Sequence, residues 1–448
     1  MARKYFGTDG VRGRANSGAM TADMVLKIGM AAGNLYRRGS HRHRVVIGKD
    51  TRLSGYMIEN ALTSGLLASG MDVFLFGPVP TPAVSMLTRS MRADLGIMIS
   101  ASHNPYADNG IKIFGPDGYK LSDELELAIE REILGEGKIP GVSPDKIGKA
   151  TRIDDARGRY IEYAKQSVGA GDLAGMKIVV DCGHGAAYLL APLIFKELGA
   201  KVVKLGVEPD GLNINEGCGA LHPDHAGRVV RDQGADLGIS FDGDADRVIF
   251  TDETGASVSG DRILTLCALA LMEEGKLRGA TMACTVMSNL GLHEALRAAG
   301  IAVLTTAVGD RHVIEALRAG GYSFGGENSG HLIFADHATT GDGILSALQV
   351  LRIMKRRGQP LSVLAQVMRE YPQSLVNLKV RAKPPLESLP RLQATLREAD
   401  AQFGDLGRHL IRYSGTEHKV RILVEHRDAD VVDAWSTRLR GVIEQELA

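Results

Sequence analysis

The stretch KIVVDCGHGAA, residues 177–187, begins a strand–helix–strand pattern that recurs in most of this chain. A short apolar run, typical of a buried strand, ends in small residues. An amphipathic segment then runs to about Leu198, and Gly199 precedes a second apolar run, AKVVKLG. This order predicts two parallel strands joined by a right-handed helical crossover, with glycine in the left-handed turn after the helix.

Two further segments have the same order. One begins with VVIGKD (45–50) and continues through a helical pattern to Gly70 and DVFLFG. The other begins with ATMACTVMSNLG (280–291) and continues to Gly300 and IAVLTT. Strands that alternate with helices indicate parallel α/β layers. We therefore expect three similar α/β domains in tandem, spaced too irregularly for a solenoid.

The C-terminal part has a different pattern. SLVNLKVRAK (374–383), RHLIRYSG and HKVRILVEH predict three strands, the last two joined by a turn. An amphipathic helix with Asp428 or Asp430 as its N-cap ends the chain. This predicts a smaller α+β domain. We expect four domains around a central cleft, with their bounds at 1–152, 153–256, 257–371 and 372–448.

Composition excludes several classes of function. The chain has 448 residues, too many for one ordinary core, and its 53 basic residues balance its 53 acidic ones. This balance favours neither nucleic acid nor an anionic membrane as a partner. The N-terminus shows no signal peptide, and the longest apolar run, Ile263 to Met272, is too short to cross a bilayer. The four scattered cysteines suit reduced, buried thiols, so we expect a cytoplasmic protein.

The acidic loop FDGDADR (241–247) carries the clearest sign of chemistry. Asp242, Asp244 and Asp246 alternate directly after the apolar run ADLGISF. Carboxylates packed this closely repel one another unless a cation lies between them, and oxygen ligands favour Mg²⁺. An EF-hand is a poor match, because Arg247 stands where that loop needs glycine. An exposed acidic turn without a metal remains an alternative for the loop alone.

The serine loop lies within ISASHNPYADNGIKIF (99–114). Ser102 directly follows an apolar strand, where a serine can carry a group covalently. His103 could orient the serine or relay a proton, and Lys112 could offset phosphate charge. The alternative is an ordinary Ser-His-Asn-Pro turn, because the spacing matches no nucleophile elbow.

Three more polar loops offer binding groups. YFGTDGVRG (5–13) sets Arg12 between glycines, where it could bind phosphate. The sugar loop, GGENSGH (325–331), offers partners for sugar hydroxyls from Glu327, Asn328, Ser329 and His331. The phosphate loop, RYSGTEHKVR (412–421), offers a phosphate dianion the donors of Arg412, Ser414, Gly415, Thr416 and Arg421. Each could be an ordinary surface loop, but the serine, acidic, sugar and phosphate loops fall on four different expected domains, which one cleft could gather.

Taken together, these motifs resemble those of the α-D-phosphohexomutase superfamily from one end of the chain to the other. The resemblance rests on KYFGTDGVRG, SASHNPYADNGIK, DGDADR, GENSGH and RYSGTE. DDARGRYIEYAK, VGDRHVIEAL and TTGDGILSALQVL resemble the branch that acts on glucosamine phosphates. The superfamily usually has proline after the loop arginine and again after the glutamate, where this chain has Tyr413 and His418. The phosphate loop is therefore expected to be less rigid.

The resemblance implies roles for these residues. Ser102 would be a phosphoserine and would complete a site for one Mg²⁺ with Asp242, Asp244 and Asp246. Arg247 and Arg12 would neutralise phosphate charge. Glu327 and Ser329, helped by Asn328 and His331, would hold the sugar. The phosphate that is not reacting would bind to Arg412, Ser414, Gly415, Thr416 and Arg421.

The implied enzyme is an isomerase that interconverts glucosamine 6-phosphate and glucosamine 1-phosphate for amino-sugar precursors of the cell wall. A hexosamine 1,6-bisphosphate would be the intermediate, and glucose 1,6-bisphosphate could serve as activator. A kinase or self-phosphorylation must prime Ser102, and a homodimer is left open. His103 and Lys112 are both candidates for the general base. Asp310 could contact the sugar amine or cap the helix that follows it.

Three alternatives remain at this point. The same chemistry could act on mannose or glucose phosphate. The chain could bind a sugar phosphate without catalysis, or it could be a metallophosphatase that releases inorganic phosphate.

Overall fold

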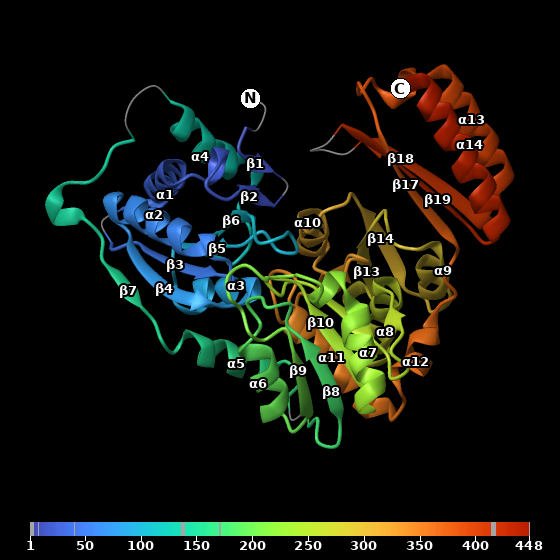
Figure 1. The fold of residues 1–448 in the computed structure, drawn as a ribbon, viewed down its shortest axis with the longest axis horizontal. Coiled ribbons are helices and arrows are strands. Elements are labelled where there is room, and N and C mark those ends of the chain that lie inside the picture. The colour runs from blue at the N-terminus through green and yellow to red at the C-terminus, as the bar shows by residue number, and fades with distance from the viewer. Residues whose placement is uncertain are drawn as a thin grey trace. The chain divides into compact units, whose positions relative to one another are not determined.

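The computed structural model describes residues 4–7, 9–39, 41–135, 139–169, 172–413 and 418–447. The chain divides into two compact units (Figure 1). The first comprises Met1–Met287 with Gly300–Val367, and the second comprises Ser288–Ala299 with Met368–Ala448. Three mixed sheets flanked by helices lie in the first unit, and one antiparallel sheet backed by helices lies in the second. The predicted fold class, three α/β domains and a smaller α+β domain, is confirmed.

The first sheet has seven strands in the order β1-β2-β6-β5-β3-β4-β7. Its strands are β1 (Phe6–Gly7), β2 (Gly10–Arg14), β3 (Arg44–Lys49), β4 (Asp72–Pro78), β5 (Leu95–Ile99), β6 (Asp108–Phe114) and β7 (Ala150–Arg152). Its helices are α1 (Ala22–Tyr36), α2 (Ser54–Ala68), α3 (Thr81–Ser90) and α4 (Asp123–Leu134). Strands β5, β3, β4 and β7 run parallel, so the carboxyl ends of β3 and β5 lie side by side.

Helices cover both faces of this sheet because side chains alternate along each strand. Val45 and Ile47 of β3 pack in one buried cluster with residues of α1 and α2. A Cβ at Gly48, which points the other way, would meet Val84 of α3 at 2.5 Å. A Cβ at Gly65 of α2 would lie 2.2 Å from the carbonyl oxygen of Leu26 in α1, so glycine permits the close contact of these two helices.

The second and third sheets each combine parallel strands with an antiparallel edge. The second, in the order β12-β11-β10-β8-β9, consists of β8 (Lys177–Asp181), β9 (Lys201–Leu205), β10 (Leu237–Phe241), β11 (Val248–Thr251) and β12 (Ser257–Val258). The third, in the order β14-β13-β15-β16, consists of β13 (Thr281–Thr285), β14 (Ala302–Thr306), β15 (Phe324–Gly326) and β16 (Leu332–Phe334). The helices are α5 (Ala156–Gln166), α6 (Leu190–Glu197), α7 (Pro223–Gln233), α8 (Gly260–Glu273), α10 (Asp310–Gly320), α11 (Gly343–Arg357) and α12 (Leu361–Leu364).

The glycines expected after three helices adopt the left-handed conformation. The φ angles are 86° at Gly70, 96° at Gly199 and 73° at Gly300. Each turns the chain from a helix into the next strand, as the repeated sequence plan predicts. Single 3-10 turns lie at Gly18–Met20, Pro144–Lys146, Gly219–Leu221, Arg278–Ala280, Ala365–Val367, Leu386–Ser388 and Gly404–Leu406.

The second unit contains the predicted C-terminal strands in the antiparallel order β17-β19-β18. Its elements are α9 (Leu290–Ala298), β17 (Gln373–Lys379), α13 (Pro390–Phe403), β18 (Gly407–Tyr413), β19 (Lys419–His426) and α14 (Ala429–Leu447). The carboxylate of Asp428 accepts the backbone N–H of Asp430 at 3.0 Å, so of the two predicted caps Asp428 is the one that acts. Helix α13 was not anticipated from the sequence.

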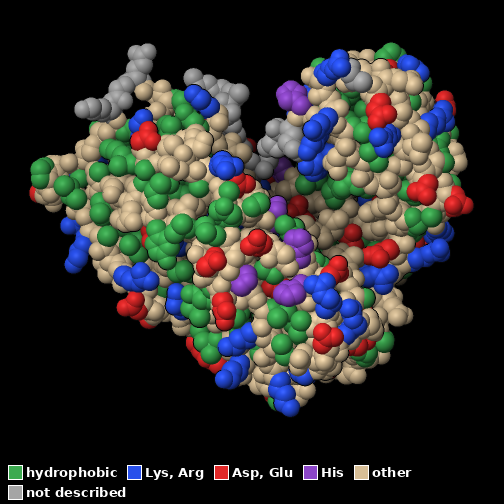
Figure 2. Space-filling view, in the orientation of Figure 1, with side chains coloured by type: hydrophobic (Ala, Val, Ile, Leu, Met, Phe, Trp, Pro, Cys, Tyr) green, Lys and Arg blue, Asp and Glu red, His purple; other side chains and the backbone are tan. Residues whose placement is uncertain are grey.

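The surface and the cysteines agree with the composition. Figure 2 shows basic and acidic side chains interspersed over the visible face. All four cysteines are free and buried, as predicted. Among the described residues, no helix has the length and apolar character needed to span a bilayer.

Candidate functional site

Two loops from different domains meet at Ser102. Ser102 follows β5 and is fully buried, and its Oγ donates a hydrogen bond to Oδ2 of Asp242 at 2.5 Å. Asp242 begins the acidic loop after β10, and its ligand oxygen lies within 4.8 Å of those of Asp244 and Asp246. The structure therefore brings together the four oxygen-bearing side chains that the sequence pointed to.

The backbone of the serine loop is held in a strained conformation. Ser102 has a φ of 54°, a left-handed value that a non-glycine residue keeps only when its surroundings enforce it. The fully buried Arg52 enforces it by donating to the carbonyl oxygens of Ser102, Asn104 and Asp108 at 3.0, 2.6 and 3.0 Å. Asn215 adds a donor to the Ser102 carbonyl at 3.0 Å. Sequence reasoning missed both residues.

The acidic loop is electrostatically suited to a divalent cation. Burial and the neighbouring Asp246 and Asp244 raise the pKa of Asp242 to about 8, since three carboxylates cannot all stay charged so close together. Oδ1 of Asp244 and Oδ1 of Asp246 are buried and have no hydrogen-bond partner among the described residues. Unpartnered carboxylate oxygens beside a serine hydroxyl form the donor set that Mg²⁺ prefers. The residues present therefore fit the predicted ion.

Lys112 joins the acidic loop to β6. Its Nζ donates to Asp244 at 2.8 Å and to Asp246 at 3.0 Å, and Thr81 donates to Asp244 at 2.5 Å. Burial lowers the pKa of Lys112, but the charges of Asp244 and Asp246 outweigh burial and raise this pKa well above its usual value. A lysine that serves as a base needs a depressed pKa, and this arrangement does not give Lys112 one.

A second group of charges lies next to Lys112. Asp9 contacts Arg12 and Lys112, and Lys120 donates to both Asp9 and Asp310 at 2.5 Å. Burial raises the pKa of Asp9, but the charges of Lys112 and Lys120 outweigh burial and hold this pKa well below its usual range.

The position of Asp310 contradicts one of the two roles predicted for it. Gly309 is the N-cap of α10, and the Asp310 carboxylate pairs with Lys120, so the interpretation of Asp310 as a helix cap is wrong. The predicted contact with a sugar amine stays a prediction. Asp9 and Lys120 were not singled out, although Asp9 lies in the quoted YFGTDGVRG motif.

His103 lies between the nucleophile and a fixed cation. Its Nδ1 is 3.4 Å from Oγ of Ser102, and Arg247 donates to the same nitrogen at 2.7 Å. Burial, together with Arg247 and Arg12, lowers the pKa of His103 to about 4. The imidazole is therefore neutral near pH 7, with Nδ1 as an acceptor.

The sugar loop is partly fixed and partly open. Oε1 of Glu327 accepts the N–H of Gly309 at 3.0 Å, and Asn328 donates to the carbonyl of Met287 at 3.3 Å. Nε2 of His331 accepts the N–H of Gly341 at 3.1 Å, and its Nδ1 lies 3.7 Å from Asp246. Ser329 is exposed. The structure thus connects His331 to the acidic loop and leaves Ser329 accessible.

The phosphate loop belongs to the second unit. Ser414, Gly415 and Thr416 lie outside the described residues. Arg412 of β18 and Arg421 of β19 are opposite each other in the strand pairing, and both are half-buried. Burial and Arg421 lower the pKa of Arg412. Nε of Arg421 is buried without an acceptor among the described residues, which suits a bound anion.

Comparison with known proteins agrees with this arrangement. Models of phosphoglucomutase/phosphomannomutase α/β/α domains I, II and III match residues 3–139, 158–255 and 259–371, and the C-terminal domain model matches 375–442. A phosphoglucosamine mutase of Geotalea daltonii is 52% identical over 448 residues, covering 99% of this chain and 98% of the relative. One of Novosphingobium aromaticivorans is 55% identical over 435 residues, 97% of each chain.

A solved structure shows the same fold. The crystal structure of a phosphoglucomutase/phosphomannomutase family protein from Burkholderia thailandensis has a TM-score of 0.82 at 27% identity, covering 98% of this chain and 97% of that one. The domain models and the whole-length relatives agree with the sequence motifs. The chain therefore belongs to the phosphoglucomutase/phosphomannomutase family and, within it, to the phosphoglucosamine mutases.

Proposed function

We propose that this chain is an isomerase that interconverts glucosamine 6-phosphate and glucosamine 1-phosphate by passing a phosphoryl group through Ser102. The phosphoglucosamine mutases of Geotalea daltonii and Novosphingobium aromaticivorans are 52% and 55% identical to it over nearly the whole chain. The observation that carries the proposal is the 2.5 Å hydrogen bond from Ser102 to Asp242, which joins a hydroxyl to three buried carboxylates. Binding alone would need neither that hydroxyl nor that cluster of acids.

The proposed reaction consists of two phosphoryl transfers. The bond from phosphorus to Oγ of phosphorylated Ser102 breaks as a bond forms to O1 of glucosamine 6-phosphate, and the O1 proton passes to the neutral His103, since Lys112 is already charged. The resulting 1,6-bisphosphate reorients. Its 6-phosphoryl group then moves to Oγ of Ser102, the proton returns to O6, and glucosamine 1-phosphate leaves. Glucose 1,6-bisphosphate, a kinase or self-phosphorylation would supply the first phosphoserine.

Charge stabilisation is the main task of the protein groups. Asp242, Asp244 and Asp246 would hold one Mg²⁺ with an oxygen on Ser102, and this ion would supply Lewis-acid stabilisation of the transferring phosphoryl group. Arg247 would also lie next to the phosphoryl group on Ser102, since it contacts His103, which lies beside Ser102. Arg12, held by Asp9, adds a second guanidinium.

The remaining residues would bind the parts of the substrate that do not react. Glu327 and Ser329 would hold sugar hydroxyls, with Asn328 and His331 keeping the loop in place. The distal phosphate would bind to Arg412, Ser414, Gly415, Thr416 and Arg421. We propose the cytoplasm as the site of action, in keeping with four buried free thiols. A homodimer also stays a proposal.

Intact mass spectrometry with activity assays tests the proposal. We expect a species one phosphate heavier than the chain, absent in Ser102→Ala, together with complete loss of mutase activity. Ser64→Ala, a change of an exposed serine on α2, should keep both. Substantial mutase activity in Ser102→Ala would exclude the phosphoserine route. Release of inorganic phosphate instead of isomer would identify a phosphatase, and kcat/KM on glucosamine, glucose and mannose phosphates would rank the substrates.

A further inference from the structure

A second group of potential metal ligands lies at the opposite end of β5 from Ser102. Among the described residues, the only groups of three that could hold an ion are the acidic triad and His41, His43 and Asp94. In the second group the ligand atoms also lie within 4.8 Å of one another. Asp94 immediately precedes β5, and the two histidines lie in the segment between α1 and β3.

The contacts within this group resemble those of a metal site. Nε2 of His41 lies 3.4 Å from Oδ1 of Asp94, and the rings of His41 and His43 are 4.0 Å apart. Two ligands that each bind one tetrahedral Zn²⁺ at about 2.0–2.1 Å lie roughly 3.3 Å apart. The two rings are tilted by 35° and lie against each other, so His41 must rotate for both lone pairs to meet at one ion; its side chain is 62% exposed and has room to do so.

The backbone orients the other two ligands. Nε2 of His43, a buried residue, lies 2.9 Å from both the N–H and the carbonyl oxygen of Arg38, so it accepts from the first in one tautomer and donates to the second in the other. Oδ2 of Asp94 accepts the N–H of Arg44 at 2.8 Å. In the tautomer whose Nε2–H donates to the Arg38 carbonyl, Nδ1 of His43 has a free lone pair for a cation, and Oδ1 of Asp94 is the second oxygen of its carboxylate. Histidines that bind metals usually donate their other N–H in this way, which fixes the ring and its tautomer.

We propose that His41, His43 and Asp94 bind one transition-metal ion, with Zn²⁺ the best match to two imidazoles and one carboxylate. Solvent would supply the fourth ligand. The ion would join the segment before β3 to the start of β5, and so would stabilise the domain that carries Ser102 without contacting substrate. This site is separate from the proposed Mg²⁺ site, whose ligands are oxygens.

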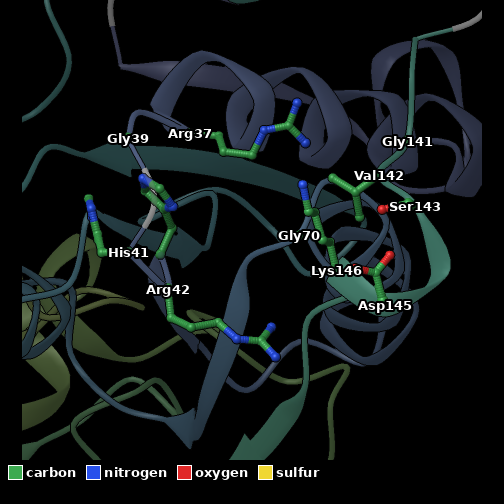
Figure 3. Close-up of a pocket in the computed structure, with 11 residues that line it drawn as sticks. Arg37, Gly39, His41, Arg42, Gly70, Gly141, Val142, Ser143, Asp145 and Lys146 are labelled. Atoms are coloured by element: carbon green, nitrogen blue, oxygen red, sulfur yellow. The ribbon is translucent and has the colours of Figure 1, made fainter.

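A cavity gives the ion a way in. His41 and His43 line a cavity of about 640 Å³ together with Arg42 and residues of the 141–146 segment (Figure 3). Arg37, Arg42 and Lys146 line the same cavity, and their positive charge weakens the binding of a cation. Arg42 is partly neutralised by Asp72, 3.6 Å away.

Zinc binding to the full-length protein tests the proposal. Asp242→Asn with Asp244→Asn removes the acidic triad as a competing site. By equilibrium dialysis with metal analysis, in excess Mg²⁺, this double variant should still bind one equivalent of Zn²⁺. Adding His41→Ala should weaken that binding by at least about 10-fold, since even the loss of an outer partner has an effect of this size. Zn²⁺ should also raise the Tm only when His41 is present.

A matched histidine change provides the control. His312→Ala, on α10 with a side chain 48% exposed, should leave the Zn²⁺ equivalent in place. X-ray absorption of the bound ion should show nitrogen as well as oxygen ligands. Binding that His41→Ala leaves unchanged, or a shell of oxygens alone, would overturn the proposal. So would a double variant that binds no Zn²⁺ at all.

Discussion

The serine loop (100–104) and the sugar loop (325–331) both present a serine, but they are held in different ways. Ser102 is completely buried in a left-handed conformation, and Arg52 and Asn215 bind its carbonyl oxygen. Ser329 is exposed, and its loop is held through its neighbours Glu327 and Asn328. The serine loop is held at the backbone of the reacting residue itself, whereas the sugar loop is held only through the neighbours of its exposed serine.

This difference matches the two tasks that we propose. An oxygen that gives and takes a phosphoryl group must stay aligned with the attacking hydroxyl, because small displacements are costly in rate. A loop that meets first one end and then the other of a 1,6-bisphosphate must accept two orientations of the sugar. We therefore expect changes around the serine loop to affect kcat and stability, and changes at the exposed Ser329 to affect KM.

Arg52→Lys should have the largest effect. Lysine keeps the positive charge but cannot reach three carbonyl oxygens, so Ser102 loses its alignment. We expect kcat to fall about 100-fold, the typical result of a displacement near 1 Å. Stability should fall by about 1–3 kcal/mol because buried acceptors lose their donor. Steady-state kinetics and thermal unfolding measure both. Arg159→Lys, an exposed change on α5, should alter neither.

Gly243→Ala should have the next largest effect. A Cβ at Gly243 would lie 2.5 Å from the carbonyl oxygen of Ser102, so alanine pushes the acidic loop away from the serine loop. We expect kcat to fall at least about 10-fold and overpacking to cost about 1–3 kcal/mol of stability. The control is Gly158→Ala in α5, where an added Cβ meets nothing within 4 Å. That change should raise stability by about 0.5–1 kcal/mol.

The strands, the acidic loop and Ser102 could be predicted from the sequence because a short local pattern marks each of them. Asp242, Asp244 and Asp246 alternate within five positions, and apolar runs mark β5 and β10. The partners that fix these groups are distant in sequence: Arg52 lies 50 residues from Ser102, and Lys120 lies 190 residues from Asp310. No local pattern shows such pairs. The left-handed backbone of Ser102 was equally hidden, because it results from those contacts.

The sequence also left the last part of the chain incompletely described. The three strands were visible as apolar runs, but α13 was missed. Helix α9 follows β13 in sequence, yet it groups with the C-terminal strands. The Asn289 side chain contributes to this grouping, since it accepts the N–H of Tyr371 and donates to its carbonyl, 82 residues away, and Glu425 of β19 accepts the N–H of Leu290.

Magnesium should stabilise the protein through the acidic loop beside Ser102 and not through the sugar loop. Because the ion would bind the acidic loop and not the sugar loop, it should raise the Tm of the wild type and of Ser329→Ala equally. At a concentration 100 times its Kd the gain would be about 2.7 kcal/mol. Asp244→Asn should lose most of this gain, and chelation should remove it from the wild type. An equal response of Asp244→Asn would show that the acids do not hold the ion.

Ser329→Ala should have the smallest effect, and it is the sharpest test of the comparison. Loss of one hydrogen bond to a sugar hydroxyl, worth about 0.5–1.5 kcal/mol, should raise KM by roughly 2- to 10-fold. Because Ser329 is exposed, Tm should not change, and kcat should stay close to the wild-type value. Steady-state kinetics at saturating bisphosphate and a thermal scan measure all three. If Ser329→Ala instead lowers Tm and kcat as Gly243→Ala does, the two loops are held equally firmly. The proposed division between a fixed serine and an open one would then be wrong.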